Sequence, residues 1–331
     1  MGVSHVVSFR PHRPRTDRAP RVTARLPLIY REGADASLDR PAHVRAASGV
    51  ARIGDRLAVV QDDTLVVALV DPRSGEVEAI HLPDDDGVRV FEPARRNKAA
   101  KHDHEAAFTF TDAAGLHLVA LGSGSTTRRQ RAAHLVWVPG ARSPRVSVVD
   151  LSRFYDMLRA TTGFSGSELN LEGAVAGDDG HLLLLQRGNG APVGALAPVD
   201  ASAWVRLDEF AALLAAPATA KVPALHDITQ HGIGTVAGGR LSFTDAAARG
   251  DRRWYLAVAE LSPNTYDDGE VVGCALGRFT PEGGEWWQIC AEDGSALLDK
   301  PEGLLVDDDG FWLVVDNDRP EQPAELLRVS F

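Results

Sequence analysis

The sequence predicts an all-β protein built as a single β-propeller, and three observations support this prediction. Its apolar runs are short and have the length of strands, as at 65–70 and 182–185. Turn signals such as the Asp-Asp-Gly at 178–180 bound these runs, which is typical of sandwiches, barrels and propellers. An acidic residue followed by a small residue recurs along the chain, each time ahead of two apolar runs. A β-sandwich would not repeat in this way, so the propeller is favoured.

The repeat has a regular internal spacing. Its starts, 57, 67, 73 and 57 residues apart, are Ser48, Glu105, Glu172, Asp245 and Glu302. Each copy ends, 14 to 18 residues later, at a polar residue that closes the second run: Asp62, Ser123, Arg187, Glu260 and Asp316. This spacing fits one four-stranded blade per copy. The count predicts five blades, and a sixth, degenerate blade stays an alternative.

The chain ends are expected to complete the ring. The last copy, residues 302–331, is long enough for only two or three strands. We expect residues 21–30 to supply the missing strand and close the ring, because an open ring leaves an unpaired edge. Residues 1–20 are then a flexible segment and residues 21–331 one propeller domain. Two short helices are expected outside the sheets, at 152–159 and 208–216.

Composition excludes several functional classes. The 46 acidic and 35 basic residues give a net charge of -11, which argues against a nucleic-acid or anionic-membrane surface. No run reaches about 18 apolar residues, so no transmembrane helix is expected. The arginine-rich start lacks the apolar stretch of a secretory signal, so a cytoplasmic location is expected, and we expect a monomer. The two cysteines show no zinc or disulfide spacing.

Acidic side chains are predicted to converge on the central channel, because each inner strand begins at the face where the next strand ends. They are Glu105, Glu172, Asp245 and Glu302, joined by Glu260 and Asp316. Carboxylates gathered in this way repel each other and lose hydration, so protonation, arginine partners or a cation must compensate them. Donors that are all oxygen suit Ca²⁺, or else Mg²⁺, better than zinc. The alternative is that each acid caps backbone N–H groups of a neighbouring blade.

Basic, hydroxyl and amide side chains predicted at the same face indicate a small anionic ligand. The candidates are Lys101, Ser123, Ser125, Arg128, Arg187, Asn264, Tyr266 and Lys300. Arginine suits phosphate or carboxylate because its planar fork donates paired hydrogen bonds. The glycine-rich turn at 121–126 can present backbone N–H groups to an anion. The alternatives are that the cations only neutralise the acids, and that the loops at 121–126 and 263–270 are plain turns.

Two segments resemble a known family. ELNLEGAV and DKPEGLLVDDDGFWLVVDND resemble the repeat of the phytase-like propellers, described as having esterase-like activity of phytase. The wider pattern LGSGSTTRR, NLEGA, LLQRGN, FTDAA, SPNTYDDGE, KPEGL and DND resembles an uncharacterised bacterial propeller family of domain-of-unknown-function type, from about residue 45 to the C-terminus. The phytase-like resemblance implies an inner metal and phosphoester or ester hydrolysis, with Glu105, Glu172 and Glu302 at the matching positions. The chain departs from that pattern at Asp245 and in lacking an export signal.

The sequence therefore predicts a metal-dependent hydrolase of a phosphoester, ester or lactone at the channel mouth. Its cation, Ca²⁺ or Mg²⁺, would be held by Glu105, Glu172, Asp245 and Glu302. Glu260 or Asp316 would be the general base, and Arg187 would hold the anion. One alternative is a non-enzymatic propeller that binds a small anion or a partner protein at the same mouth. Another is a structural platform whose acids only link blades.

Overall fold

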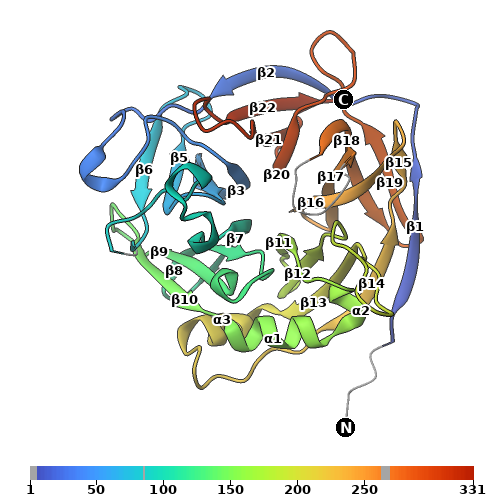
Figure 1. Ribbon diagram of the computed structural model, residues 1–331, viewed down its shortest axis with the longest axis horizontal. Helices are drawn as coiled ribbons and strands as arrows, with labels where there is room; N and C mark the ends of the chain where they lie inside the picture. The colour runs from blue at the N-terminus through green and yellow to red at the C-terminus, as the bar shows by residue number, and fades with distance from the viewer. Residues whose placement is uncertain (1–5, 85, 262–268) are drawn as a thin grey trace.

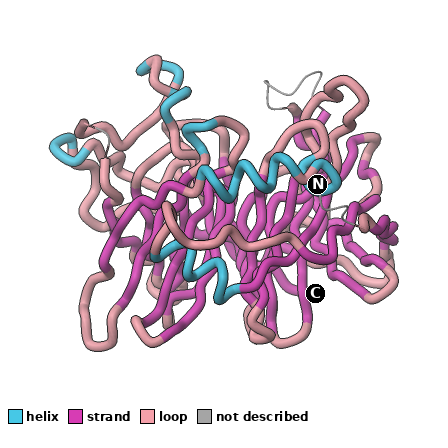
Figure 2. The backbone as a smooth tube through the Cα atoms, turned by 90° about the horizontal axis from the view of Figure 1, so that it is seen from below, coloured by secondary structure: helices cyan, strands magenta, loops and turns pink. Residues whose placement is uncertain are grey.

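The structure, a computed structural model, describes residues 6–84, 86–261 and 269–331. It is all-β, with a few short helices. Antiparallel groups of four strands lie around a common centre in a propeller-like arrangement (Figure 1). Seen edge on, the strands cross the thickness of the molecule and the loops gather at its faces (Figure 2). The expected fold class is confirmed at this level.

The strands follow one another along the chain within each group. The first group is β3 (Ala47–Ile53), β4 (Arg56–Gln61), β5 (Val66–Val70) and β6 (Val77–His81). The second group is β7 (His104–Asp112), β8 (Gly115–Gly122), β9 (Arg131–Trp137) and β10 (Arg145–Asp150). The third group is β11 (Leu171–Ala176), β12 (His181–Gln186), β13 (Ala201–Arg206) and β14 (His226–Gly232). The predicted apolar runs in these groups therefore lie in or overlap strands.

The remaining groups contain the C-terminal strands. The fourth group is β16 (Gly239–Arg249), β17 (Arg252–Leu261), β18 (Glu270–Thr280) and β19 (Gly283–Gln288), with the short β15 (Thr235–Val236) beside β16. The fifth group is β20 (Lys300–Val306), β21 (Phe311–Asp316), β22 (Glu325–Ser330) and β2 (Arg21–Pro27). In this last group β2 pairs antiparallel with β22, with Leu26 opposite Leu326. The N-terminal segment thus supplies the fourth strand of the C-terminal group.

A further N-terminal strand, β1 (Ser8–Pro14), lies inside the segment that the sequence predicts to be flexible. It pairs in parallel with β14 along its first half and with β19 along its second half. The third and fourth groups therefore join into one ten-stranded sheet.

The groups pack through their inner strands and through apolar clusters between neighbours. β3, β7, β11, β16 and β20 contact one another in that order, and β20 also contacts β3. A Cβ atom added to Gly49 would lie 2.8 Å from the carbonyl oxygen of Glu105 on the next inner strand. One added to Gly303 would lie 3.0 Å from the backbone of Gly49. This close approach explains why a small residue follows the acid in the repeat.

The helices lie outside the sheets. α1 (Ser152–Ala160) and α3 (Leu207–Ala215) form within one residue of their predicted bounds, and α2 (Thr162–Ser165) adds one unpredicted turn. Phe154 and Phe210 are fully buried and pack these helices into the apolar cluster between the second and third groups. Short 3-10 turns occur at Ala36–Leu38, Pro93–Arg95, Lys98–Ala100 and Thr127–Arg129. Within the described residues, no helix has the length and apolar character needed to cross a membrane.

Candidate functional site

Every inner strand carries a β-bulge, in the middle of β16 and near the start of the other four, and these bulges align the repeats. The pairing register shifts between residues 47 and 49, 104 and 106, 171 and 173, 243 and 245, and 301 and 303. The extra residues at these shifts are Ser48, Glu105, Glu172, Thr244 and Glu302. A bulge re-aims its extra side chain, so these five positions are equivalent in the structure.

The fourth copy of the repeat is therefore displaced by one residue from its sequence alignment. Thr244 is the counterpart of the three glutamates, and Asp245 occupies the small-residue position. Asp245 is fully buried, and its carboxylate accepts hydrogen bonds from the backbone N–H groups of Ala246 and Leu304, both at 2.7 Å. Burial raises the pKa of Asp245 well above its ordinary value. Asp245 thus matches the alternative in which an acid binds backbone groups of a neighbouring strand group.

The two hydroxyl residues among the bulged positions link neighbouring inner strands. Ser48 Oγ donates to the carbonyl oxygen of His104 at 2.5 Å. Thr244 Oγ1 donates to the carbonyl oxygen of Pro301 at 3.1 Å. In both cases the accepting residue immediately precedes the bulged glutamate of the next group. A bulged hydroxyl therefore acts as a structural link.

Replacing Thr244 by valine is expected to lower the free energy of unfolding by about 1–2 kcal/mol. The carbonyl oxygen of Pro301 would keep its buried position and lose its hydrogen-bond donor. Urea unfolding measures the change. Thr23→Val is the matched control, because Thr23 is exposed and also donates to a backbone carbonyl, that of Arg328. Equal losses in the two variants would contradict the role of Thr244 as a buried link.

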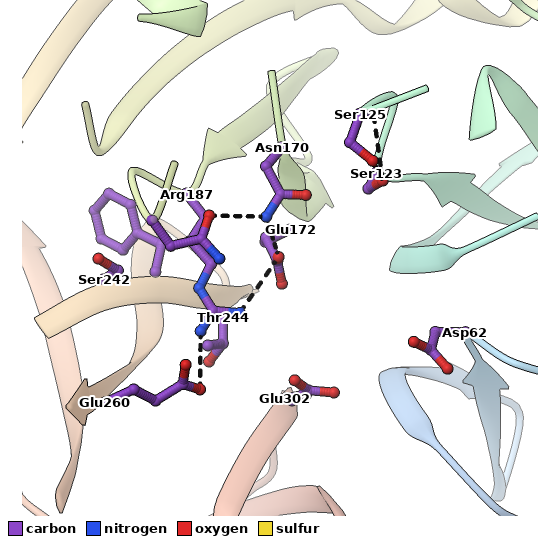
Figure 3. Close-up of polar contacts among 12 residues, drawn as sticks. Asp62, Ser123, Ser125, Asn170, Glu172, Arg187, Ser242, Thr244, Glu260 and Glu302 are labelled. Atoms are coloured by element: carbon purple, nitrogen blue, oxygen red, sulfur yellow. Dashed lines mark hydrogen bonds and ion pairs between the residues drawn. The ribbon is translucent and has the colours of Figure 1, made fainter. Parts of the chain in front are cut away.

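Glu172 is held in a chain of polar contacts on the third and fourth groups (Figure 3). Asn170 Nδ2 donates to Glu172 Oε1 at 2.6 Å, and Arg187 Nη1 donates to the same oxygen at 3.4 Å. The second terminal nitrogen of Arg187 donates to Glu260 Oε1 at 3.1 Å. Arg187 is buried just beyond the end of β12, and the two carboxylates hold its pKa above its ordinary value although burial opposes its charge. Arg187 thus fixes both carboxylates.

A second network joins the first and second groups. Lys101 Nζ lies 2.5 Å from Asp62 Oδ2 and 2.6 Å from Asp103 Oδ1. Arg129 Nη1 lies 2.9 Å from Asp103 Oδ2, and the Ser123 hydroxyl donates to the same oxygen. Burial opposes ionisation of Asp103, but Lys101 and then Arg129 outweigh it and hold its pKa below the ordinary value. Asp103 is thus an ionised, fully compensated carboxylate.

Glu105 is the carboxylate that the network leaves without an ion pair. No hydrogen bond or ion pair joins it to another described residue. Burial raises the pKa of Glu105 well above its ordinary value, and the charges of Asp103 and Glu172 add to the effect. The positive charges of Lys101 and Arg187 also act on Glu105, but they do not outweigh its burial.

The fifth group adds two further carboxylates with raised pKa values. Burial raises the pKa of Glu302 to about 8, although Lys300 Nζ lies 3.2 Å from its Oε1. Burial and the charge of Glu302 also raise the pKa of Asp316 well above its ordinary value. Figure 3 shows Glu302, Glu172 and Asp62 turned toward one another from three different strand groups. The centre of the strand groups therefore holds more carboxylates than cations can neutralise.

Asp62, Asp103 and Glu105 are close enough together to share one ion. Each offers one carboxylate oxygen, and these oxygens lie within 4.8 Å of one another. Sequence reasoning did not assign Asp62 or Asp103 to the site. A signal for Asp62 existed, because it follows Ser48 by 14 residues as Asp316 follows Glu302. Asp103 precedes Glu105 by two residues on the same strand entry.

The other predicted ligand residues have these positions. Ser123 and Ser125 lie side by side, with their hydroxyl oxygens 2.9 Å apart. Arg128 donates from Nε to the carbonyl oxygen of Ala100 at 3.1 Å, whereas its neighbour Arg129 reaches the carboxylate of Asp103. Two predicted residues, Asn264 and Tyr266, lie outside the described residues.

Several solved structures are similar to this chain in overall shape. An α-L-arabinanase from Cellvibrio cellulosa, complexed with arabinohexaose, is 12% identical, with 86% of this chain and 92% of that chain covered and a TM-score of 0.44. A mannose phosphorylase from Leishmania mexicana, complexed with phosphate ion, is 10% identical, with 94% and 89% covered and a TM-score of 0.45. The pyranose dehydrogenase PQQ domain from Coprinopsis cinerea is 13% identical, with 97% and 100% covered and a TM-score of 0.39. Likeness at this level carries no information on activity or substrate.

Similarity in sequence is more specific. No curated protein matches the chain. One family model matches residues 43–331. This range contains all the strands except the N-terminal β1 and β2. The chain therefore belongs to a family of unknown function, DUF6929.

Proposed function

We propose that this protein is a hydrolase that cleaves a phosphoester, ester or lactone with the help of a divalent cation. One observation carries the proposal. At the five equivalent bulged positions, the hydroxyls of Ser48 and Thr244 link neighbouring strands, whereas Glu105, Glu172 and Glu302 make no such backbone link within the described residues. The glutamates instead share the centre with other carboxylates. Gathering these carboxylates lowers the stability of the protein, and a ligand that binds their negative charge explains why they are present.

The same proposal includes the finer architecture. The five strand groups are the blades of one closed propeller, and β2 completes the last blade. Support comes from the order of contacts among the inner strands, in which β20 meets β3, and from the pairing of β2 with β22. The channel mouth is then the end where the inner strands begin, and the bulged residues line it.

The residues at this mouth fit a hard cation. Asp62, Asp103 and Glu105 offer oxygen donors only, which suits Ca²⁺ and, as the second candidate, Mg²⁺. Lys101 forms ion pairs with the two aspartates, whereas Glu105 forms none with a described residue. Glu172 and Glu302 add negative charge nearby, as their effect on the pKa of Glu105 shows. Asp245 is left out of the proposed cation site, because backbone groups occupy its carboxylate.

The chain's own side chains divide the remaining work. A cation held at Glu105 would polarise a substrate oxygen and lower the pKa of a bound water. Glu260 or Asp316 accepts the proton of the attacking water. Arg187 fixes the orientation of Glu260 and supplies positive charge beside the substrate anion. Lys300 and Ser125 are the further candidates for anion contact.

The resemblance to the phytase-like propellers supports the same class of reaction. Glu105, Glu172 and Glu302 match the repeated Glu-Gly/Ala motif of that family, and the bulges now give these three residues one structural position. Thr244 takes this position in the fourth group, so the difference from the family lies there rather than at Asp245.

A non-enzymatic role in binding a small anion or a partner protein is the second candidate. Arg129 Nη1 donates to Ser125 Oγ at 2.8 Å, and the two serine hydroxyls beside it form a cluster of donors around a glycine turn. Such a cluster can hold an anion without a metal ion. This role needs neither Glu105 nor a general base.

Calorimetric titration of chelator-treated protein with Ca²⁺ and with Mg²⁺ tests the cation site. We expect Ca²⁺ to bind with a dissociation constant on the order of micromolar and to raise the melting temperature. Glu302→Gln should weaken this binding at least tenfold, because it removes one negative charge near the cation. Glu321→Gln, at an exposed position, is the matched control and should change nothing.

A substrate panel separates the enzyme from the binding protein. Phosphoester, ester and lactone substrates are assayed with Ca²⁺ and with chelator. Cation-dependent turnover that is lost in Glu260→Gln or in Asp316→Asn supports the hydrolase. Cation binding without turnover of any class would favour the binding role, and no cation binding at all would overturn the proposal.

A further inference from the structure

The strand β1 is built into the molecule as a strap between two strand groups. Its first half pairs with β14, the outer strand of the third group, and its second half pairs with β19, the outer strand of the fourth. The strap lies outside residues 43–331, the part that the family model matches. Glycines make room for it, since a Cβ atom on Gly284 would lie 2.4 Å from His12 Nδ1 and one on Gly283 2.2 Å from the Pro11 carbonyl oxygen.

His12 is the buried anchor of this strap. Its Nδ1 lies 2.6 Å from the Tyr255 hydroxyl, and its Nε2 lies 2.9 Å from His231 Nδ1. His231 Nε2 in turn lies 2.9 Å from the Ser202 hydroxyl. The four side chains come from β1, β13, β14 and β17 and are all buried. One continuous chain of hydrogen bonds therefore connects the strap to both groups.

This chain of hydrogen bonds is complete when both histidines are neutral. The contact between the two rings needs one N–H and one nitrogen lone pair, and each hydroxyl can donate or accept at the ends. A first added proton places a charge among Phe243, Tyr255 and Phe279, whose rings surround His12. A second added proton sets N–H against N–H between the rings and breaks their contact.

No carboxylate accepts a hydrogen bond from this pair. All four ring nitrogens face Tyr255, Ser202 or each other. Arg10 on the strap acts against a positive charge on His231, and Tyr255 is the remaining titratable group of the chain. Glu285 on β19, whose charge acts on Tyr255, is bound by Arg15 and Arg278. A proton here therefore gains no counter-charge.

We infer that β1 is an acid-sensitive strap, held between the third and fourth groups by the neutral pair His12 and His231 and released when the pair is protonated. Released, it uncovers the facing edges of β14 and β19 and unlinks the two groups. The inner strands do not depend on it, since β1 contacts only outer strands in its pairing. The released state is therefore a local opening.

The sign of the pH dependence follows from the histidine pKa values. Burial lowers the pKa of His12 from 6.5 to about 4, and burial with the charge of His12 lowers that of His231 to about 3. Once the strap is released, the pKa values of His12 on the strap and of His231 on β14 return to the ordinary value. Docking is then strongest above about pH 6.5 and weakens as the pH falls toward about 4, by about tenfold per pH unit for each proton taken up.

Hydrogen exchange of the full chain, corrected for intrinsic rates, tests the strap. Between about pH 7 and about pH 5, the opening equilibrium of amides in residues 8–14 should rise by one to three orders of magnitude, for one or two protons. Amides of β2, the other N-terminal strand, are the internal control and should change little. Simultaneous exchange of all peptides would overturn the inference, because it would show global unfolding without a separate strap.

Two variants assign the effect to the pair. The glutamine in His231→Gln can still hydrogen-bond Ser202 and His12 but takes up no proton. The opening equilibrium of residues 8–14 should therefore change with pH by about tenfold less per pH unit than in the wild type. His134→Gln is the matched control, because His134 contacts His117, whose other nitrogen faces the carboxylate of Asp112. If His231→Gln fails to fold, ring resonances of the wild-type histidines decide. The resonances assigned to His12 and His231 should stay neutral to about pH 4, and titration of these two rings near pH 6.5 would overturn the inference.

Discussion

Replacing Glu105 by glutamine is expected to weaken Ca²⁺ binding about a hundredfold or more and to stabilise the cation-free protein. Glu105 forms no ion pair with a described residue, and burial, together with the charges of neighbouring carboxylates, raises its pKa. Glutamine keeps the shape of the side chain and removes the charge that a cation needs. The same change removes the penalty for holding an acid in this place.

The expected gain in stability is about 0.5–2 kcal/mol at neutral pH, as for other substitutions that relieve strain at functional sites. Its pH dependence has a fixed sign. Because the pKa of Glu105 is raised above the ordinary 4.5, the unfolded chain releases its proton first, so the penalty grows as the pH rises above 4.5. The difference between the variant and the wild type should therefore shrink toward about pH 4.5.

Calorimetry and urea unfolding at about pH 7 and about pH 4.5 measure both effects. Glu321→Gln, at an exposed position, is the control and should show neither. Unchanged Ca²⁺ affinity in Glu105→Gln would place the cation elsewhere. A loss of stability would show that Glu105 has a structural partner after all.

The sequence predicted which types of residue gather in the candidate site better than it predicted how the repeat copies align. The repeat identified the three glutamates, because an acid before a small residue recurs at a regular distance from a second strand. It misaligned the fourth copy, since a bulge inserts a residue on one strand only and the pairing register is invisible in the sequence. Asp245 therefore took the place that belongs to Thr244.

The strap β1 was missed for a different physical reason. Its sequence, Ser-Phe-Arg-Pro-His-Arg-Pro, alternates charged residues and prolines, and His12 is the residue that it buries. Pairing with the edges of β14 and β19 determines its extended conformation, so its own sequence lacks the apolar alternation that would predict a strand. The strand β2, by contrast, was expected because the last repeat lacks a strand, and its pairing with β22 follows from that deficit.

Replacing Arg187 by methionine is expected to lower the free energy of unfolding by about 3–5 kcal/mol. The guanidinium joins Glu172 and Glu260, and its side chain is only 7% exposed. Its removal leaves two carboxylates in a poorly solvated place without their cation, which is the costly way to break a buried ion pair. Methionine keeps the length and apolar stem of the side chain, so the loss reports charge rather than packing.

Arg206→Met is the matched control for this prediction. Arg206 also pairs with a carboxylate, that of Asp208, but both side chains are more than half exposed, so no measurable loss is expected. The triple change Arg187→Met with Glu172→Gln and Glu260→Gln should recover most of the loss, because it removes the stranded charges along with the arginine. Urea unfolding of the four proteins decides the matter. A loss in Arg187→Met that the triple change does not recover would mean that Arg187 acts through packing, and the assignment of Arg187 as the group that fixes both carboxylates would fall.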